Sequence, residues 1–157
     1  MRILSPKISK FFINLFPPLL FNRIVVKRVS KDFREVDVKV KLSFMNKNLQ
    51  RTIFGGTLFS AADPFFSLMY YQILAHKKIA AEAWVKRIEI DYLRPANKDV
   101  YLNFRISETD VEKAIEGIEK YKKFEKIHNL DIVGTDNKVY CKVTIWVYLK
   151  ESIPVLK

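Results

Sequence analysis

Several short segments of the chain alternate between apolar and polar residues, which predicts strands with one face in water. The clearest is 35–44, whose apolar members are Val36, Val38, Val40, Leu42 and Phe44. Successive side chains of a strand point to opposite faces, so this spacing places one face on a core. Similar patterns predict strands over 24–29, 83–94, 100–106, 126–133 and 139–147.

Three other segments carry helical patterns. Residues 57–75 are almost wholly apolar on all sides of a helical wheel, so this helix must be enclosed by protein. Residues 5–16 read as a helix that Ser5 caps and Pro17-Pro18 ends. Residues from 109 or 110 to 124 read as an exposed helix with two ion pairs, Glu116–Lys120 and Glu119–Lys123.

The order of these elements predicts an α+β fold. Two strands, one buried helix and about four further strands pack most economically as a curved antiparallel sheet of five to six strands around the central helix. We expect a single domain over 1–157, with 1–23 as a helical extension. Open sheet edges rich in Val and Ile predict a homodimer or homotetramer.

Composition narrows the classes of function. The formal net charge of +11 favours an anionic partner, yet the basic residues are spread along the chain. Nucleic-acid binding would need a clustered basic face with stacking aromatics, and the sequence shows none. Cys141 is the single cysteine and the two histidines lack metal-ligand spacing, so we expect a reducing, cytoplasmic compartment and no metal.

The basic, Phe-rich segment near the start has two interpretations. Its apolar run, 11–21, is interrupted by the proline pair and is too short to cross a bilayer. We favour an amphipathic helix packed on the domain. Contact with a membrane surface is the minor alternative.

One polar stripe on the central helix is the first candidate for chemistry. Ser60, Asp63 and Ser67 share a helix face, and Asp63 is the single ionisable residue between Arg51 and His76. A carboxylate in such surroundings is costly unless it is paired or wetted. Pro64 follows it and should push Asp63 out of helical geometry. A buried salt bridge beside a simple kink explains the same residues equally well.

A second candidate precedes the helix. Gly55-Gly56 would let backbone N–H groups approach a ligand at the positive end of the helix dipole, where a thioester carbonyl would be polarised. An ordinary glycine turn is the alternative. Elsewhere, Cys141 and His128 could form a nucleophilic pair but fit the core better, and His76 is expected to cap the helix end.

The run from Asn48 through Phe54-Gly55-Gly56 to Asp63 resembles the signature of hotdog-fold thioesterases of the phenylacetyl-CoA thioesterase type. Residues 92–96 and the turn 32–36 extend the resemblance over nearly the whole chain, toward an uncharacterised branch of that superfamily. The resemblance implies a hotdog fold, with Asp63 as general base or nucleophile, Gly55 and Gly56 holding the carbonyl, and Asn48 orienting substrate or water. It also implies that two subunits share each site.

The family histidine is replaced by Phe54 here. Lys86 has the parity of Trp84 and Ile88 on its strand, so one hypothesis is that it points inward and lowers the pKa of Asp63. A lysine that extends to the edge instead is the alternative, and it explains the pattern equally well. We also expect four residues to contact the substrate, namely Phe54, Thr57, Ser60 and Ser67. Arg51, Arg87 or Arg94 could meet the coenzyme A phosphates. A tunnel beside Asp63 lined by Phe59, Phe65, Phe66 and Tyr70 would indicate a long or aromatic acyl group, whereas a filled pocket would indicate loss of catalysis.

These residues predict a hydrolase of acyl-CoA or acyl-carrier thioesters. It needs no cofactor, because the coenzyme A thioester is itself the substrate. A non-catalytic module that binds acyl groups or acyl-CoA is the alternative, which the loss of the histidine favours.

Overall fold

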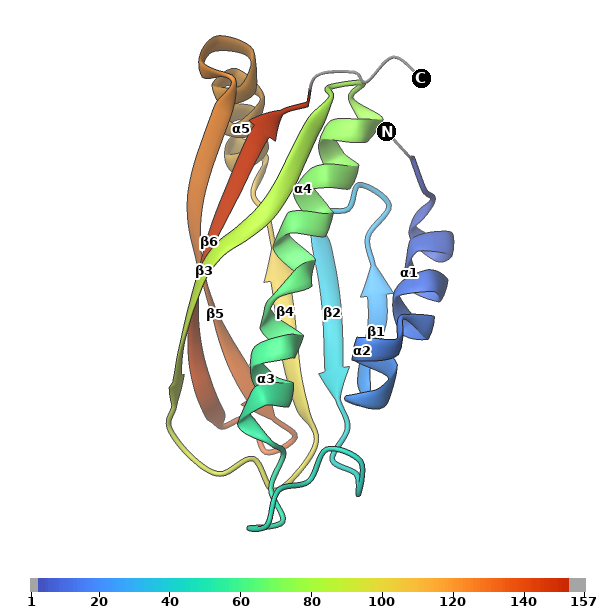
Figure 1. Ribbon diagram of the computed structural model, residues 1–157, viewed down its shortest axis with the longest axis vertical. Helices are drawn as coiled ribbons and strands as arrows, with labels where there is room; N and C mark the ends of the chain where they lie inside the picture. The colour runs from blue at the N-terminus through green and yellow to red at the C-terminus, as the bar shows by residue number, and fades with distance from the viewer. Residues whose placement is uncertain (1–2, 153–157) are drawn as a thin grey trace.

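A six-stranded antiparallel sheet forms the frame of the molecule, seen in a computed structural model that describes residues 3–152 (Figure 1). The spatial order is β1-β2-β4-β5-β6-β3, so β1 and β3 are the two edges. The elements are α1 (Pro6–Leu15), α2 (Pro17–Phe21), β1 (Ile24–Val29), β2 (Glu35–Val40), α3 (Gly55–Ala62), α4 (Pro64–His76), β3 (Ala81–Tyr92), β4 (Val100–Arg105), α5 (Glu108–Tyr121), β5 (Lys123–Gly134) and β6 (Val139–Glu151).

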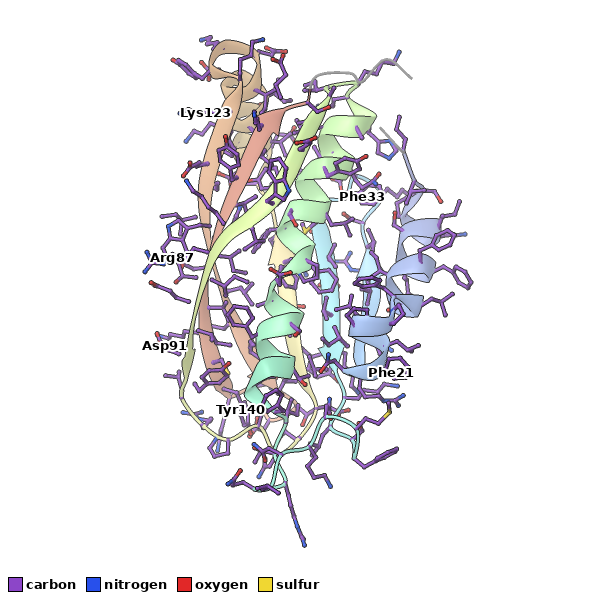
Figure 2. The ribbon with its side chains drawn as sticks, viewed as in Figure 1. Phe21, Phe33, Arg87, Asp91, Lys123 and Tyr140 are labelled. Atoms are coloured by element: carbon purple, nitrogen blue, oxygen red, sulfur yellow. The ribbon has the colours of Figure 1, made fainter. Side chains whose placement is uncertain are left out.

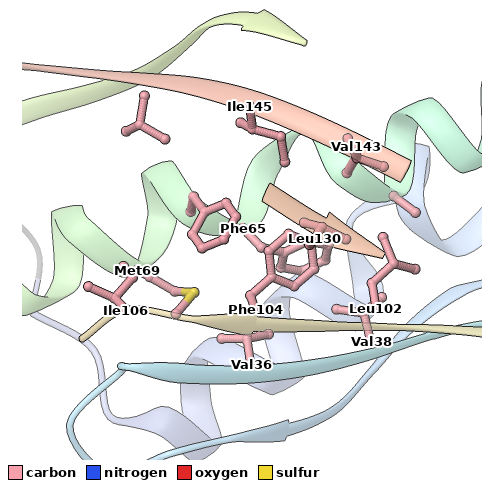
Figure 3. Packing of buried hydrophobic residues seen from close by; sticks show 14 of the residues in the cluster. Val36, Val38, Phe65, Met69, Leu102, Phe104, Ile106, Leu130, Val143 and Ile145 are labelled. Carbon is pink, nitrogen blue, oxygen red and sulfur yellow. The ribbon is translucent and has the colours of Figure 1, made fainter. Parts of the chain in front are cut away.

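The core lies between the sheet and the helices α3 and α4, which cross one face of it (Figures 1 and 3). Phe65 of α4 packs against Phe104 of β4 with ring centroids 4.9 Å apart. The inward rows of β2 and β6 are buried as their alternation predicted. The α+β fold with one central helix under a curved antiparallel sheet is therefore confirmed.

Strand β2 is shorter than its alternation suggested. It ends at Val40, because the Asp99 carboxylate accepts the Leu42 N–H at 2.9 Å and the Asn46 side chain donates to the Lys41 carbonyl at 2.9 Å. These contacts turn the chain away from the sheet. Phe44, predicted to face the core, is 88% exposed.

The central helix is interrupted at Asp63, where α3 ends and α4 begins. Pro64 has no N–H to donate, yet Asp63 keeps helical angles of φ −67° and ψ −57°. The prediction that Asp63 leaves helical geometry is wrong. One stripe of this helix stays at least partly open to solvent in the single chain, formed by Phe59, Ser60, Asp63, Pro64, Ser67, Leu68 and Tyr71.

Strand β3 contains a bulge that reverses its alternation. Its register against β6 shifts between Val85 and Arg87. One extra residue in a strand moves the preceding side chains to the other face. Trp84, predicted to face inward, is therefore 46% exposed and stacks on Tyr148 of the neighbouring strand.

The flanking helices follow their local signals closely. Ser5 caps α1 by accepting the Ile8 N–H at 3.3 Å, as predicted. Helix α5 ends at Lys122 in the left-handed region, earlier than expected. The Glu116–Lys120 pair forms at 2.6 Å, whereas the predicted Glu119–Lys123 pair is wrong because Lys123 starts β5.

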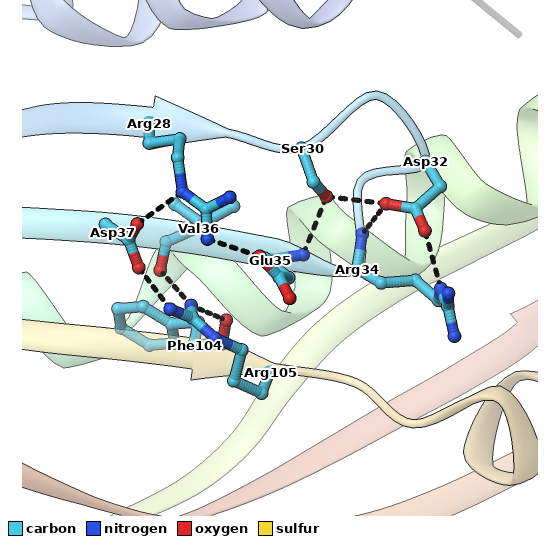
Figure 4. Close-up of polar contacts among 9 residues, drawn as sticks. All are labelled: Arg28, Ser30, Asp32, Arg34, Glu35, Val36, Asp37, Phe104 and Arg105. Carbon is cyan, nitrogen blue, oxygen red and sulfur yellow. Dashed lines mark hydrogen bonds and ion pairs between the residues drawn. The ribbon is translucent and has the colours of Figure 1, made fainter.

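The outer face of β1, β2 and β4 carries a network of ion pairs (Figure 4). Asp37 accepts from Arg28 at 2.7 Å and from Arg105 at 2.5 Å, which joins the three strands. In the turn before β2, the Ser30 hydroxyl and Arg34 hold the pKa of Asp32 at about 2. These exposed pairs position the strands and contribute little stability individually.

Candidate functional site

Asp63 is the first residue of the candidate site, at the junction of α3 and α4. Within residues 3–152 it forms no ion pair and accepts no hydrogen bond. Partial burial raises the pKa of its carboxyl group, because desolvation disfavours the charged form. An unpaired carboxylate with a raised proton affinity on an open helix face is suited to accept a proton from water.

The predicted contact between Lys86 and Asp63 is wrong. The β3 bulge turns Lys86 to the outer face of the sheet, where its ammonium group donates to Glu125 at 2.8 Å. It also lies 5.4 Å from the centre of the Tyr148 ring. The pKa of Asp63 is accordingly raised, the opposite of what a neighbouring ammonium would produce.

Three hydroxyl groups predicted at the substrate already donate within the protein. Ser60 donates to the Gly56 carbonyl at 2.8 Å and Ser67 to the Pro64 carbonyl at 3.0 Å. Thr57 is buried and donates to the Asn22 side chain at 2.8 Å, which ties α3 to α2. None of these hydroxyls is directed at Asp63 in the single chain.

The glycine pair forms the first turn of α3. The N–H groups of Thr57 and Leu58 both donate to the Phe54 carbonyl, whereas those of Gly55 and Gly56 have no acceptor within residues 3–152. A side chain at Gly56 would start 2.3 Å from the exposed Phe54 ring, so the ring would have to move to make room for it. Two free amides at a helix start can receive a carbonyl oxygen.

Tyr92 supports this turn, a role that the sequence did not indicate. Its hydroxyl donates to the Gly55 carbonyl at 2.9 Å from the end of β3. The ring lies 3.3 Å from where a Gly55 side chain would begin. The motif 92–96 therefore contacts the glycine pair, although the two segments are far apart in the sequence.

A depression of about 400 Å³ lies beside the glycine pair. Asn48 lines it, but its side chain closes the loop through two bonds to Thr52, at 2.9 and 3.0 Å. Of the arginines predicted to meet phosphates, Arg94 lines the depression. Arg51 is exposed in the turn before the glycines, and Arg87 pairs with Glu89 on β3.

A largely apolar groove of about 440 Å³ runs along α4 from Pro64 to the N-terminal helices. It is lined by Phe12, Ile13, Phe16, Leu19, Pro64, Phe65, Ser67, Leu68, Tyr71 and Ala83. Phe59, Phe65, Phe66 and Tyr70 do not line a common tunnel within residues 3–152, because Phe66 and Tyr70 are buried in the core and Tyr70 contacts His128 at 3.1 Å. The groove begins at Pro64, the neighbour of Asp63.

The remaining candidates are structural. Cys141 and His128 lie opposite Ile132 and Ile145 in the ladder of β5 and β6, four residues apart, so they cannot act as a pair. Burial raises the pKa of Cys141 to about 11 and lowers that of His128 to about 4. His76 contacts the Leu4 carbonyl at 3.2 Å and holds the N-terminal segment, contrary to the predicted helix cap. No metal-binding group of side chains occurs among residues 3–152.

Asp63 and the glycine pair are too far apart to serve one substrate group within one chain. Asp63 lies seven positions after Gly56 along the helix. At the helical rise per residue this is about 10 Å. One chain therefore carries half of an expected site at Asp63 and half of another at the glycine pair.

Solved structures share this architecture. One from Pseudomonas aeruginosa, described as a protein of unknown function and probable thioesterase, has a TM-score of 0.83 at 14% identity over 96% of this chain and 98% of that one. A thioesterase from Haemophilus influenzae gives 0.71 at 11% identity over 99% and 97%. The PaaI protein of the E. coli phenylacetic acid degradation operon gives 0.63 at 16% identity over 92% and 91%.

The fold is thus the hotdog fold of these thioesterases. The chain belongs to the family described as domain of unknown function DUF4442, whose model matches residues 5–147. No curated protein sequence matches it. Across residues 3–152, no helix is long and apolar enough to cross a membrane.

Proposed function

We propose that this protein hydrolyses an acyl thioester at a site shared by two copies of the chain. The unpaired Asp63 carboxylate beside an apolar groove is the observation that carries the proposal. The structural neighbours of this protein include named thioesterases, which supports hydrolysis of a thioester. Acyl-CoA is the substrate that we favour, with an acyl-carrier thioester as the other donor.

The distance between Asp63 and the glycine pair supports a site shared by two chains. The open edge of β3 can pair with the same edge of a second copy by a two-fold axis. Such an axis reverses the direction of the second helix, so that Gly55 and Gly56 of one copy approach Asp63 of the other. This arrangement also covers the open stripe of the central helix.

The chemistry that we propose needs no cofactor. Asp63 takes a proton from a water molecule, and the oxygen of that water attacks the thioester carbon. The carbonyl oxygen gains the electron pair and is held by the Gly55 and Gly56 amides. When the intermediate collapses, the C–S bond breaks and the thiolate leaves with the proton from Asp63. Direct attack by the Asp63 carboxylate is the alternative first step.

The groove along α4 would hold the acyl chain. Its lining is apolar over most of its length, and it starts one residue from the proposed base. Arg94, beside the glycine depression, is the candidate for a phosphate of coenzyme A. The acyl chain would then lie across the central helix, with the thioester group between the groove and the depression beside the glycines.

Hydrolysis of a panel of acyl-CoA esters of increasing length tests the proposal. Asp63→Asn should lower kcat/KM by at least about 100-fold. Asp131→Asn, which removes an exposed carboxylate from β5, is the matched control and should change nothing. The rate should fall as the pH drops through the raised pKa of Asp63, because the carboxylate must be ionised to act.

The replacement of the family histidine by Phe54 favours a second function, acyl-CoA binding without turnover. Calorimetric binding of a non-hydrolysable acyl-CoA analogue separates the two. Binding to both the wild type and Asp63→Asn, with hydrolysis by neither, would establish the binding module and contradict the enzyme.

A further inference from the structure

Helix α1 packs with its polar side toward the protein and its apolar side outward. Four residues at the spacing of one helix face point away from the sheet, and each is about half exposed: Ile8 47%, Phe11 60%, Phe12 59% and Leu15 52%. The opposite side carries Ser9, which is buried, and Asn14, together with Ile13, which packs against the core. An amphipathic helix on a globular protein ordinarily has the reverse orientation.

The edge of the sheet explains why the polar side faces inward. The Asn14 side chain accepts the Val26 N–H at 2.8 Å and donates to the Val26 carbonyl at 3.2 Å. Lys10 donates to the Lys27 carbonyl at 2.8 Å. These side chains satisfy backbone groups that the edge strand β1 would otherwise expose. The outward apolar stripe is therefore fixed by the packing of α1.

The apolar surface continues into α2. Phe16, Leu20 and Phe21 are 54%, 42% and 61% exposed, and Figure 2 shows Phe21 on the side of the molecule opposite Arg87 and Lys123. We call the surface formed by Ile8, Phe11, Phe12, Leu15, Phe16, Leu20 and Phe21 the apolar stripe. Seven large apolar side chains, each more than 40% exposed and carried by two consecutive helices, mark a contact site.

The charge around the apolar stripe identifies the kind of partner. Residues 1–31 contain seven basic residues and no acidic one, since Asp32 is the first carboxylate of the chain. Lys7 and Lys27 are exposed and pair with no carboxylate within residues 3–152. A second copy placed on this surface would bring like charges together, whereas an anionic lipid surface would neutralise them.

We propose that the apolar stripe docks the protein on an anionic lipid bilayer. The Phe and Leu side chains enter the boundary between headgroups and acyl chains, and the lysines meet lipid phosphates. The inference is independent of the proposed hydrolysis. It places the open end of the groove, at Phe12 and Phe16, against the lipid.

Flotation with lipid vesicles tests this docking. The full chain should float with vesicles of phosphatidylglycerol and phosphatidylcholine, and far less with phosphatidylcholine alone or at high ionic strength. Phe11→Ser with Leu15→Ser, neither of which lines the groove, should lower the bound fraction at least about tenfold. Lys7→Glu with Lys27→Glu should do the same.

Matched controls remove equal apolar area or charge elsewhere. Tyr121→Ser with Ile127→Ser, which are 69% and 49% exposed, should bind vesicles like the wild type. So should Lys113→Glu with Lys142→Glu. Circular dichroism melts of every variant establish that it is folded.

Two results would overturn the proposal. One is equal flotation with neutral and anionic vesicles, or none with either. The other is a fall in molar mass by light scattering when Phe11 and Leu15 are replaced, without vesicle binding by the wild type, which would show that a second copy covers the apolar stripe. Hydrolysis of acyl-CoA in lipid-free buffer is measured in parallel, so that failure of docking and failure of the proposed activity are distinguished.

Discussion

The Asp63 carboxylate costs folding energy when it is charged. Its pKa in the folded chain lies above the ordinary value of 3.8, so stability falls as the pH rises through this interval and stays lower above it. Asp63→Asn should therefore be more stable than the wild type at neutral pH, by less than about 1 kcal/mol because solvent screens the group. Urea unfolding measures the difference, which should vanish below about pH 3. A destabilised variant would contradict this account.

His128 has the opposite pH signature. Burial lowers its pKa from 6.5 to about 4, so the unfolded chain binds a proton more readily than the folded one in this interval. Stability should fall as the pH drops from 6.5 to 4, by up to about 3 kcal/mol. His128→Gln, which can still contact the Tyr70 hydroxyl, should flatten this part of the curve of unfolding free energy against pH. An unchanged slope would assign the acid sensitivity to other groups.

Residues that break a local rule could be found from the sequence, and residues that act through tertiary contacts could not. Asp63 is a lone charge in an apolar helix, and Gly55-Gly56 is a glycine pair at its start. The roles of Tyr92 and Lys86 depend on the end of β3 and on its bulge, which no local pattern encodes. The roles predicted for Thr57, Ser60 and Ser67 at the substrate stay predictions; the Thr57 hydroxyl bonds to Asn22, which is distant in the sequence, so that its acceptor could not be predicted from a local pattern.

Two serines of α1 should respond to substitution with opposite signs. Ser5→Ala removes the cap of the helix and should destabilise the protein by about 1 kcal/mol. Ser9→Ala removes a buried hydroxyl that has no hydrogen-bond partner within residues 3–152 and should stabilise it by about 1 kcal/mol. Thermal unfolding of the two variants checks the pair. A loss of stability in both would mean that Ser9 has an acceptor in solution.

At the scale of elements, the alternation located every strand, and the errors lie where one element meets another. Strand β2 stopped at Val40 because side chains of Asp99 and Asn46 capture its next backbone groups. The inward face predicted for β3 was wrong for the residues before the bulge, because a single inserted residue cannot be recognised in the sequence pattern. Edge contacts likewise set the orientation of α1, which its own periodicity would have reversed.

Complementation between two inactive variants tests the shared site at the scale of the whole molecule. Asp63→Asn lacks the base, and Gly56→Val places a side chain against Phe54 at the carbonyl site. Mixed dimers carry one intact site out of two, so co-expression in equal amounts should restore about a quarter of the wild-type rate. Light scattering should give about twice the chain mass of 18.5 kDa. Folded variants that regain no activity together would place the whole site within one chain.

The architecture as a whole was predictable because composition, strand order and the apolar helix all agree on one packing solution. The homodimer or homotetramer stays a prediction, because a single chain leaves both the stripe of the central helix and the β3 edge without a described partner. The sequence indicates that a partner covers these two surfaces. The distance between Asp63 and the glycine pair indicates which groups that partner must supply.

The two edges of the sheet differ in whether another strand can pair with them. This difference limits how many copies of the chain can assemble through their sheet edges. Asn14 and Lys10 bond to backbone groups of Val26 and Lys27 in the middle of β1, so α1 obstructs pairing at this edge of the sheet, while the β3 edge stays available. Growth by strand addition then terminates after a single step. A truncated protein lacking α1 would have two edge strands that are open to pairing with other copies, and we expect it to polymerise into open-ended fibres.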